Sequence, residues 1–167
     1  MGGPFTEMKK ELIEKPCSHP RILFIDDEAW LHEMMDPVIR NYFKEVYLLK
    51  FRNRDEAWHE MLRTEPDLVI TDLRNDNVPL LPGTRKEDLG MSGFELLRLL
   101  AARRVKYPIL VASGCLSISG QEGWAKQCAG PNLKVSYLTK PFTTELFYKG
   151  LFKCLGPSSN PDILKSG

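Results

Sequence analysis

Short apolar runs alternate along the chain with stretches in which apolar residues recur at helical spacing. The apolar runs, which have the length and composition of buried strands, are 21–25 (RILFI), 45–49, 67–71 (DLVIT), 109–112 and 135–138. The helical stretches are 28–43, 55–64, the segment that follows Ser92 as far as Ala101, 120–129 and 143–155. Five strands that alternate with five helices predict an α/β protein in which helices cover both faces of an open, five-stranded parallel sheet.

Local start and stop signals agree with these elements. Ser92, with Glu95 three residues later, has the pattern of a capping box at the start of a helix. Gly156 and Pro157 are typical residues for ending the last helix. Pro37 lies inside the first helical stretch, where we expect it to kink or interrupt the helix.

The pattern divides the chain into three parts: a leader over 1–20, one domain over 21–156, and a short polar tail over 157–167. A length of 167 residues with 43% hydrophobic and 27% charged residues is typical of a single globular domain. A net charge of +1 gives no general attraction to nucleic acid, so none is expected as a partner. We find no signal peptide and no apolar run long enough to span a membrane, which predicts a cytoplasmic protein. Four cysteines without a CxxC pair do not suggest a disulfide framework or a zinc site.

Polar residues follow four of the five predicted strands. They are Asp26 and Asp27 after the first strand, Asp72 after the third, Ser113 after the fourth and Lys140 after the fifth. Ligands of such sheets bind outside the carboxyl ends of the strands, where the strand order reverses. If the order is 2-1-3-4-5, the first and third strands are neighbours and the three carboxylates share one pocket.

Three carboxylates in one pocket repel each other by about 1 kcal/mol per pair even at the dielectric constant of water. A bound cation relieves that repulsion, and an all-oxygen set suits Mg²⁺. Lys140 adds a positive charge and Ser113 a hydroxyl donor. These groups together fit a phosphoryl group held covalently on one aspartate.

The set Asp26-Asp27, Asp72, Ser113 and Lys140-Pro141 resembles the receiver domain of two-component response regulators. The resemblance covers about residues 21–156, with the five strands in register. It implies the flavodoxin-like, doubly wound fold with strand order 2-1-3-4-5. It also implies a phosphorylation switch rather than an enzyme, apart from Mg²⁺-dependent self-phosphorylation and autodephosphorylation.

The resemblance implies a metal site around the phosphoacceptor. Asp72 matches the phosphoacceptor and Asp27 matches the direct ligand of the metal ion. Asp26 matches the residue that holds the metal less directly, and Arg74 matches the position that lends its backbone carbonyl. A simpler role for Asp26 and Asp27, as acids at the positive end of a helix, is compatible with metal binding.

The resemblance also implies a switch beside that site. Ser113 matches the switch hydroxyl, Tyr137 the aromatic residue that turns inward on activation, and Lys140 the phosphate-binding lysine. Pro141 matches a proline that often follows this lysine in a cis peptide. An ordinary role as a buried aromatic residue of a strand explains Tyr137 equally well.

The partners follow from the same resemblance. A histidine kinase or a histidine phosphotransfer protein supplies the phosphoryl group. A downstream protein binds the face formed by the fourth helix (120–129), the fifth strand (135–138) and the fifth helix (143–155). Two alternatives stay open: the chain is a receiver fragment of a larger regulator, or it is an interaction module that works without phosphorylation.

The sequence departs from the receiver pattern around the phosphoacceptor. The glycine expected shortly after it is Gly93, which lies 21 positions (93 minus 72) beyond Asp72. We therefore expect an enlarged loop over about 74–91, which is either a tolerated insertion or a partial cover for the site. Arg74 is an unusually long side chain at its position, and it excludes a phosphatase-like hydrolase, which needs a general acid there.

Overall fold

A five-stranded parallel sheet organises the molecule. The computed structural model describes residues 19–73 and 90–164, and its strands pair in the order β2-β1-β3-β4-β5, which confirms the predicted order. The strands are β1 (Arg21–Ile25), β2 (Tyr47–Phe51), β3 (Leu68–Thr71), β4 (Ile109–Ser113) and β5 (Val135–Thr139). The chain therefore has the predicted doubly wound α/β fold.

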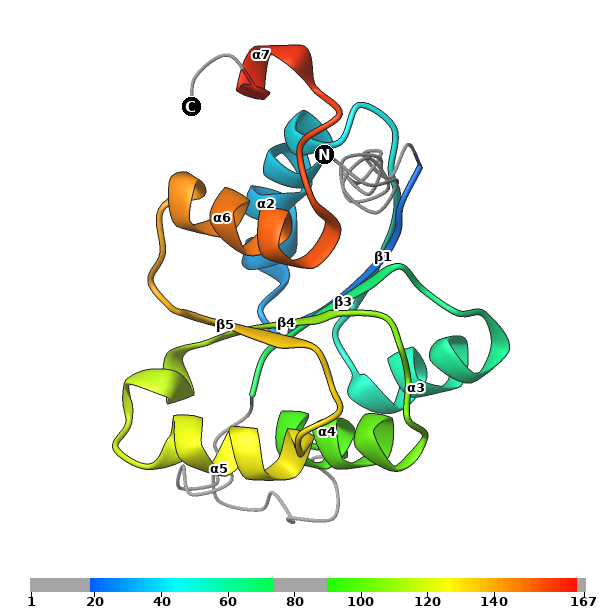
Figure 1. Ribbon diagram of the computed structural model, residues 1–167, viewed down its shortest axis with the longest axis vertical. Helices are drawn as coiled ribbons and strands as arrows, with labels where there is room; N and C mark the ends of the chain where they lie inside the picture. The colour runs from blue at the N-terminus through cyan, green and yellow to red at the C-terminus, as the bar shows by residue number, and fades with distance from the viewer. Residues whose placement is uncertain (1–18, 74–89, 165–167) are drawn as a thin grey trace, which may run out of the picture.

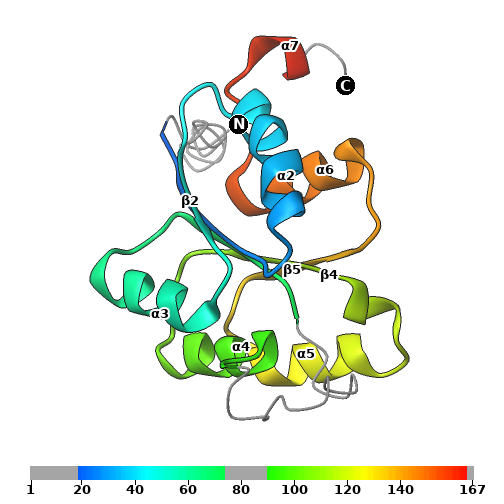
Figure 2. The same cartoon turned by 180° about the vertical axis from the view of Figure 1, so that it is seen from behind.

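Helices cover both faces of the sheet. They are α2 (Ala29–Tyr42), α3 (Arg54–Arg63), α4 (Gly93–Ala102), α5 (Gln121–Ala129) and α6 (Thr144–Leu155), with a 3₁₀ turn η2 (Gly114–Ser117) before α5 and a short α7 (Pro161–Leu164). Figure 1 shows α2 and α6 on one side of the sheet and α3, α4 and α5 on the other, and the view from behind in Figure 2 shows the same three layers. No helix in the described part of the chain is both long enough and apolar enough to cross a membrane.

The inner strands β1, β3 and β4 bury side chains on both faces, which is why their sequences are continuous apolar runs. Within β1, Leu23 and Ile25 belong to the core beneath α3, α4 and α5, whereas Ile22 and Phe24 belong to the core beneath α2 and α6. All four are at most 1% exposed. This double burial holds β1 inside the sheet, between β2 and β3, and fixes the position of the residues that follow it.

Two local expectations differ from the structure. The second strand lies two residues later than predicted, because Tyr47, not Glu45, pairs with Arg21 at the start of β1. Pro37 does not interrupt α2, which continues to Tyr42.

Residues after α6 pack against α2 instead of extending into solvent. The Ser158 hydroxyl, only 2% exposed, donates to the Tyr42 carbonyl, and the Tyr42 hydroxyl donates to the Gly156 carbonyl at 2.8 Å. Asn160 donates to the Asn41 carbonyl at 2.7 Å. The described part of the predicted tail is therefore attached to the C-terminal end of α2, where Figure 1 shows α7.

Gly93, the first residue of α4, allows the chain to pass close to the end of β3. A Cβ atom at this position would lie 2.3 Å from the Asp72 carbonyl oxygen and 2.8 Å from the Leu73 Cα. We expect Gly93→Ala to lower the free energy of unfolding by about 1–3 kcal/mol, the usual cost of overpacking, as measured by urea denaturation. Gly123→Ala in α5 is the matched control, because nothing lies within 4 Å of its added Cβ. It should raise stability by about 0.5–1 kcal/mol, and equal effects of the two changes would contradict the close approach.

Candidate functional site

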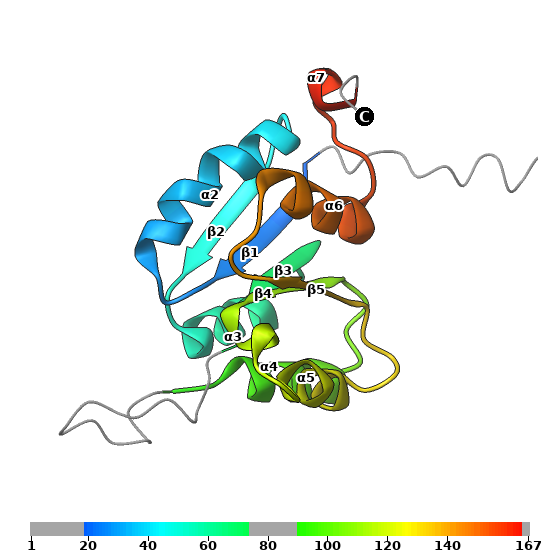
Figure 3. The same cartoon turned by 90° about the vertical axis from the view of Figure 1, so that its left-hand side faces the viewer.

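The three predicted carboxylates meet at the carboxyl ends of the neighbouring strands β1 and β3. Ile25, the last residue of β1, pairs with Thr71, the last residue of β3, so the aspartates that follow are neighbours. Asp26, Asp27 and Asp72 each offer an oxygen atom, and these atoms lie within 4.8 Å of one another. In Figure 3 the arrows of β1 and β2 point to this end of the molecule, away from the C-terminus.

The three carboxylates differ in their exposure. Asp26 is 1% exposed, and its Oδ1 accepts a hydrogen bond of 2.9 Å from the Glu28 backbone N–H. The Asp72 side chain is 13% exposed and Asp27 is exposed. The buried Oδ1 of Asp72 has no hydrogen-bond partner among the residues that the structure describes.

Lys140 reaches this acidic cluster from the end of β5. Its ammonium group lies 2.7 Å from Asp26 Oδ2, 3.7 Å from Asp72 Oδ2 and 4.0 Å from Glu28 Oε1. The Lys140 backbone N–H donates to the Ser113 carbonyl at 3.1 Å, and the Lys140–Pro141 peptide is cis, as predicted. Burial disfavours the charged lysine, but the hydrogen bond to Asp26 and the charge of Asp72 outweigh it and raise the pKa of Lys140.

Burial also raises the pKa of Asp72, and the charge of Asp26 adds to the effect. The neighbouring Ser113 hydroxyl and the charges of Lys140 and Arg54 act in the opposite direction. A carboxylate with a raised pKa in the folded protein is more costly to hold ionised than the same group in the unfolded chain. In the folded protein the negative charges of the site therefore repel one another, and a bound cation would reduce this repulsion.

The predicted switch hydroxyl is fully buried beside the backbone that follows Asp72. Ser113 is 0% exposed, and its Oγ donates to the Leu73 carbonyl at 3.1 Å and accepts from the Cys115 N–H at 3.2 Å. The Cys115 thiol donates to the same carbonyl at 2.9 Å. Ser113 is thus adjacent to the acidic cluster, as expected, but in this structure its hydrogen bond goes to the backbone.

Two residues that the strand pattern does not predict also belong to the site. Arg54, only 4% exposed, donates from Nη2 and Nε to the Asp72 carbonyl, at 3.0 and 3.3 Å. Glu28 adds a fourth carboxylate near Lys140. One sequence signal points to Arg54: a cation in the first turn of a helix interacts unfavourably with the helix dipole, which suggests that another interaction of this side chain compensates for it.

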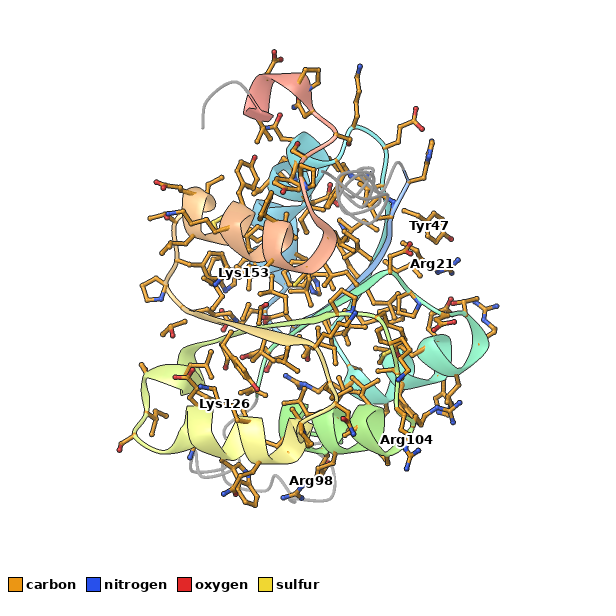
Figure 4. All side chains as sticks on the ribbon, in the orientation of Figure 1. Arg21, Tyr47, Arg98, Arg104, Lys126 and Lys153 are labelled. Atoms are coloured by element: carbon orange, nitrogen blue, oxygen red, sulfur yellow. The ribbon has the colours of Figure 1, made fainter. Side chains whose placement is uncertain are left out.

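Tyr137 is half-buried on β5. The ammonium group of Lys126, which Figure 4 shows between α5 and the sheet, lies 5.7 Å from the centroid of its ring. Burial raises the pKa of Tyr137. Its inward turn on activation stays a prediction.

The predicted backbone ligand Arg74 lies outside the described residues, as does most of the expected loop over 74–91. The hypothesis that this loop covers the site therefore stays a prediction.

The donors that are present suit a hard divalent cation. Asp26, Asp27 and Asp72 supply only oxygen atoms, and the buried Asp72 Oδ1 is a polar atom that still lacks a donor or cation within the described part of the chain. Mg²⁺ binds one or two carboxylates and keeps several water molecules, so it does not require a closed protein cage. The site thus fits Mg²⁺ by the chemistry of its donors.

Comparison with solved structures supports the fold described above. No protein-family model and no curated protein matches the sequence. Among solved structures, the chain is similar to a DNA-binding response regulator of the LuxR family from Staphylococcus aureus, with a TM-score of 0.63 and 16% identity over 81% of this chain and 98% of the other. It is also similar to a CheY-like response regulator receiver domain protein from Methanospirillum hungatei, with a TM-score of 0.62 and 17% identity over 90% of this chain and 100% of the other.

A third example is the chemotaxis protein CheY4 from Vibrio cholerae, with a TM-score of 0.60 and 20% identity over 82% of this chain and 99% of the other. These chains are matched almost over their full length, and the sheet order found here matches the CheY-like fold. The chain therefore has the CheY-like fold of response regulator receiver domains.

Proposed function

We propose that this chain is the receiver of a two-component system and takes a phosphoryl group on Asp72 from a histidine kinase or a histidine phosphotransfer protein. The observation that supports this most strongly is the meeting of Asp26, Asp27, Asp72 and Lys140 at the switch point of a receiver-like sheet. Isolated acidic residues are common at strand ends. A buried carboxylate that faces a lysine and two further carboxylates is a much more specific arrangement.

In the proposed reaction, an Asp72 carboxylate oxygen attacks the phosphorus atom of a phosphohistidine. The P–N bond breaks as the new P–O bond forms, and the leaving imidazole nitrogen keeps the electron pair of the broken bond and takes a proton from solvent. Asp26 and Asp27 would hold Mg²⁺ together with Asp72, and the bound ion would offset the negative charge of the phosphoryl group. Lys140 already lies 3.7 Å from Asp72 and needs little movement to bind a phosphoryl oxygen.

The new charge on Asp72, about −1.5 to −2 at neutral pH, biases the surroundings of the site. Ser113 exchanges its bond with the Leu73 carbonyl for a bond to the phosphoryl group, and Tyr137 follows. These residues lie on β4 and β5, so the change reaches the surface formed by α5, β5 and α6, where a downstream protein would bind. In this proposal the chain is a switch whose chemistry is limited to its own phosphorylation and dephosphorylation.

Exposure to acetyl phosphate tests this function without knowledge of the natural kinase. With Mg²⁺, the intact mass of the wild-type protein should increase by one phosphoryl group. Without Mg²⁺, or in the Asp72→Asn variant, it should stay unchanged. Labelling of equal extent in Asp72→Asn would show that Asp72 is not the acceptor, and no labelling of the wild type by any small phosphodonor would contradict the proposed function.

A further inference from the structure

Arg54 is a buried cation in an unfavourable place. It is 4% exposed, and it is the first residue of α3, where the positive end of the helix dipole disfavours a cation. Arginine is almost never fully buried unless its donors are paired. The helix does not need this side chain as a cap, because Asn53 already accepts hydrogen bonds from the backbone N–H groups of Asp55 and Glu56.

The contacts of Arg54 lead to the backbone of the proposed phosphoacceptor. Its Nη2 and Nε both donate to the Asp72 carbonyl oxygen, at 3.0 and 3.3 Å. A planar guanidinium offers two N–H groups in a rigid fork, which a lysine ammonium group cannot reproduce. Arg54, 18 positions earlier in the chain, thus holds the backbone carbonyl group of Asp72 in place.

Other groups fix the same short segment. The Thr71 hydroxyl donates to the Asp72 carbonyl at 3.0 Å, and Gly93 approaches that carbonyl so closely that a Cβ atom would lie 2.3 Å from it. The next carbonyl, that of Leu73, accepts from the Ser113 hydroxyl and the Cys115 thiol. Among the described side chains that donate to the Asp72 and Leu73 carbonyls, Arg54 is the one that carries a charge. Hydrogen bonds from charged donors are about twice as strong as those from neutral donors.

We propose that Arg54 is a positioning residue for Asp72: its fork on the Asp72 carbonyl fixes the backbone of the phosphoacceptor and thereby the direction in which the carboxylate attacks. This inference rests on the proposed function and names a further residue of the same site. Arg54 acts on Asp72 through the backbone, because the two hydrogen bonds that it donates to this residue go to the carbonyl and not to the carboxylate. Misplacing a reacting group by about 1 Å can slow a reaction by about 10²-fold, so the loss of this fork should affect rate more than binding.

The test compares Arg54→Lys and Arg54→Gln with the wild type. Two quantities are measured: the rate constant of phosphorylation by saturating acetyl phosphate with saturating Mg²⁺, and the affinity for Mg²⁺ alone by calorimetry. Lysine keeps the charge but not the fork, so both variants should be phosphorylated at least about tenfold more slowly. The Mg²⁺ affinity of Arg54→Lys should stay within about threefold of wild type, because a cation is kept near the site. That of Arg54→Gln should stay within about threefold of wild type or increase, because a cation that repels Mg²⁺ is removed.

Arg63→Lys and Arg63→Gln are the matched controls at the other end of α3, where the arginine is 75% exposed and pairs with Glu60. Both should behave as wild type. A wild-type rate in Arg54→Lys would overturn the inference, because charge alone would then suffice. Parallel losses of rate and Mg²⁺ affinity would also overturn it, because they indicate a general structural role.

If neither Arg54 variant folds, Thr71→Val decides the question, because it removes the other side-chain donor to the same carbonyl among the described residues and keeps the side-chain shape. A rate a few-fold slower with unchanged Mg²⁺ affinity is expected, and an unchanged rate would overturn the inference. The proposed function fails on a different result: a wild-type protein that takes up no phosphoryl group. If the wild type is labelled and Arg54→Lys is labelled equally fast, only the role of Arg54 is wrong.

Discussion

Replacement of Lys140 by alanine should lower the free energy of unfolding at neutral pH by about 3 kcal/mol and slow phosphorylation by about 10²-fold or more. The stability loss arises because Asp26, 1% exposed, would keep a buried charge without its hydrogen-bonded partner. The rate loss arises because no ammonium group would then lie near the oxygens of the transferred phosphoryl group. Urea denaturation and labelling with acetyl phosphate measure the two effects.

The pH dependence of the Lys140 contribution has a definite sign. Because its pKa is raised in the folded protein, its contribution is complete below the pKa of the unfolded chain and is lost only as the pH rises through the raised value. The deficit of Lys140→Ala should therefore be constant around neutrality. Lys149→Ala is the control, since this lysine is 65% exposed and pairs with Glu145 within α6. Its effect should stay below about 1 kcal/mol, and a Lys140→Ala variant as stable as this control would contradict the buried ion pair.

The Asp72→Asn variant should be more stable than the wild type at pH 7, by roughly 1 kcal/mol, although it cannot be phosphorylated. The pKa of Asp72 is raised in the folded protein, so ionisation of this group costs stability as the pH rises through that value. The advantage of asparagine should therefore be present at neutral pH and shrink as the pH is lowered toward about 4, the pKa of an unfolded aspartate. Urea denaturation over this pH range measures it.

Magnesium should reverse that order of stability. At a free Mg²⁺ concentration of 100 times its dissociation constant, a site that binds only the folded protein adds about 2.7 kcal/mol. The wild type should then exceed Asp72→Asn, which has lost one of its carboxylates. Glu33→Gln, an exposed change on α2, is the control and should alter stability by less than about 0.5 kcal/mol under both conditions. An Asp72→Asn variant that is less stable than the wild type without Mg²⁺ would contradict the stored repulsion.

The sequence predicts the architecture well because the inner strands β1, β3 and β4 are buried on both faces. The residues from Ile22 to Ile25 are all apolar, so they do not show the alternation of apolar and polar residues that a half-exposed strand has. Such a run is typical of an internal strand in a sheet that is covered on both faces. The sequence pattern places the edge strand β2 two residues too early, because this strand is less buried than the inner strands. Its position depends on pairing with β1, which no local pattern reveals. Pro37 was expected to disturb α2, but packing of residues on both sides of it, such as Met35 and Ile39, keeps the helix continuous.

The candidate site was predictable to the extent that it lies at strand ends. Asp26, Asp27, Asp72, Ser113 and Lys140 come together because parallel strands place their carboxyl ends at one edge. Arg54 was not predicted, because it comes from the start of a helix and reaches a backbone carbonyl, and sequence patterns do not show backbone acceptors. The hydrogen bond of Ser113 to the Leu73 carbonyl was missed for the same reason.

The most direct test of the account is to locate the phosphoryl group on the protein. After treatment with acetyl phosphate and Mg²⁺, borohydride reduction converts an acyl phosphate into a stable alcohol that peptide mass spectrometry can assign to a residue. The account predicts a single Mg²⁺-dependent modification at Asp72, absent from the sample without Mg²⁺. Modification of any other residue in place of Asp72, or modification of Asp72 that does not depend on Mg²⁺, would contradict it.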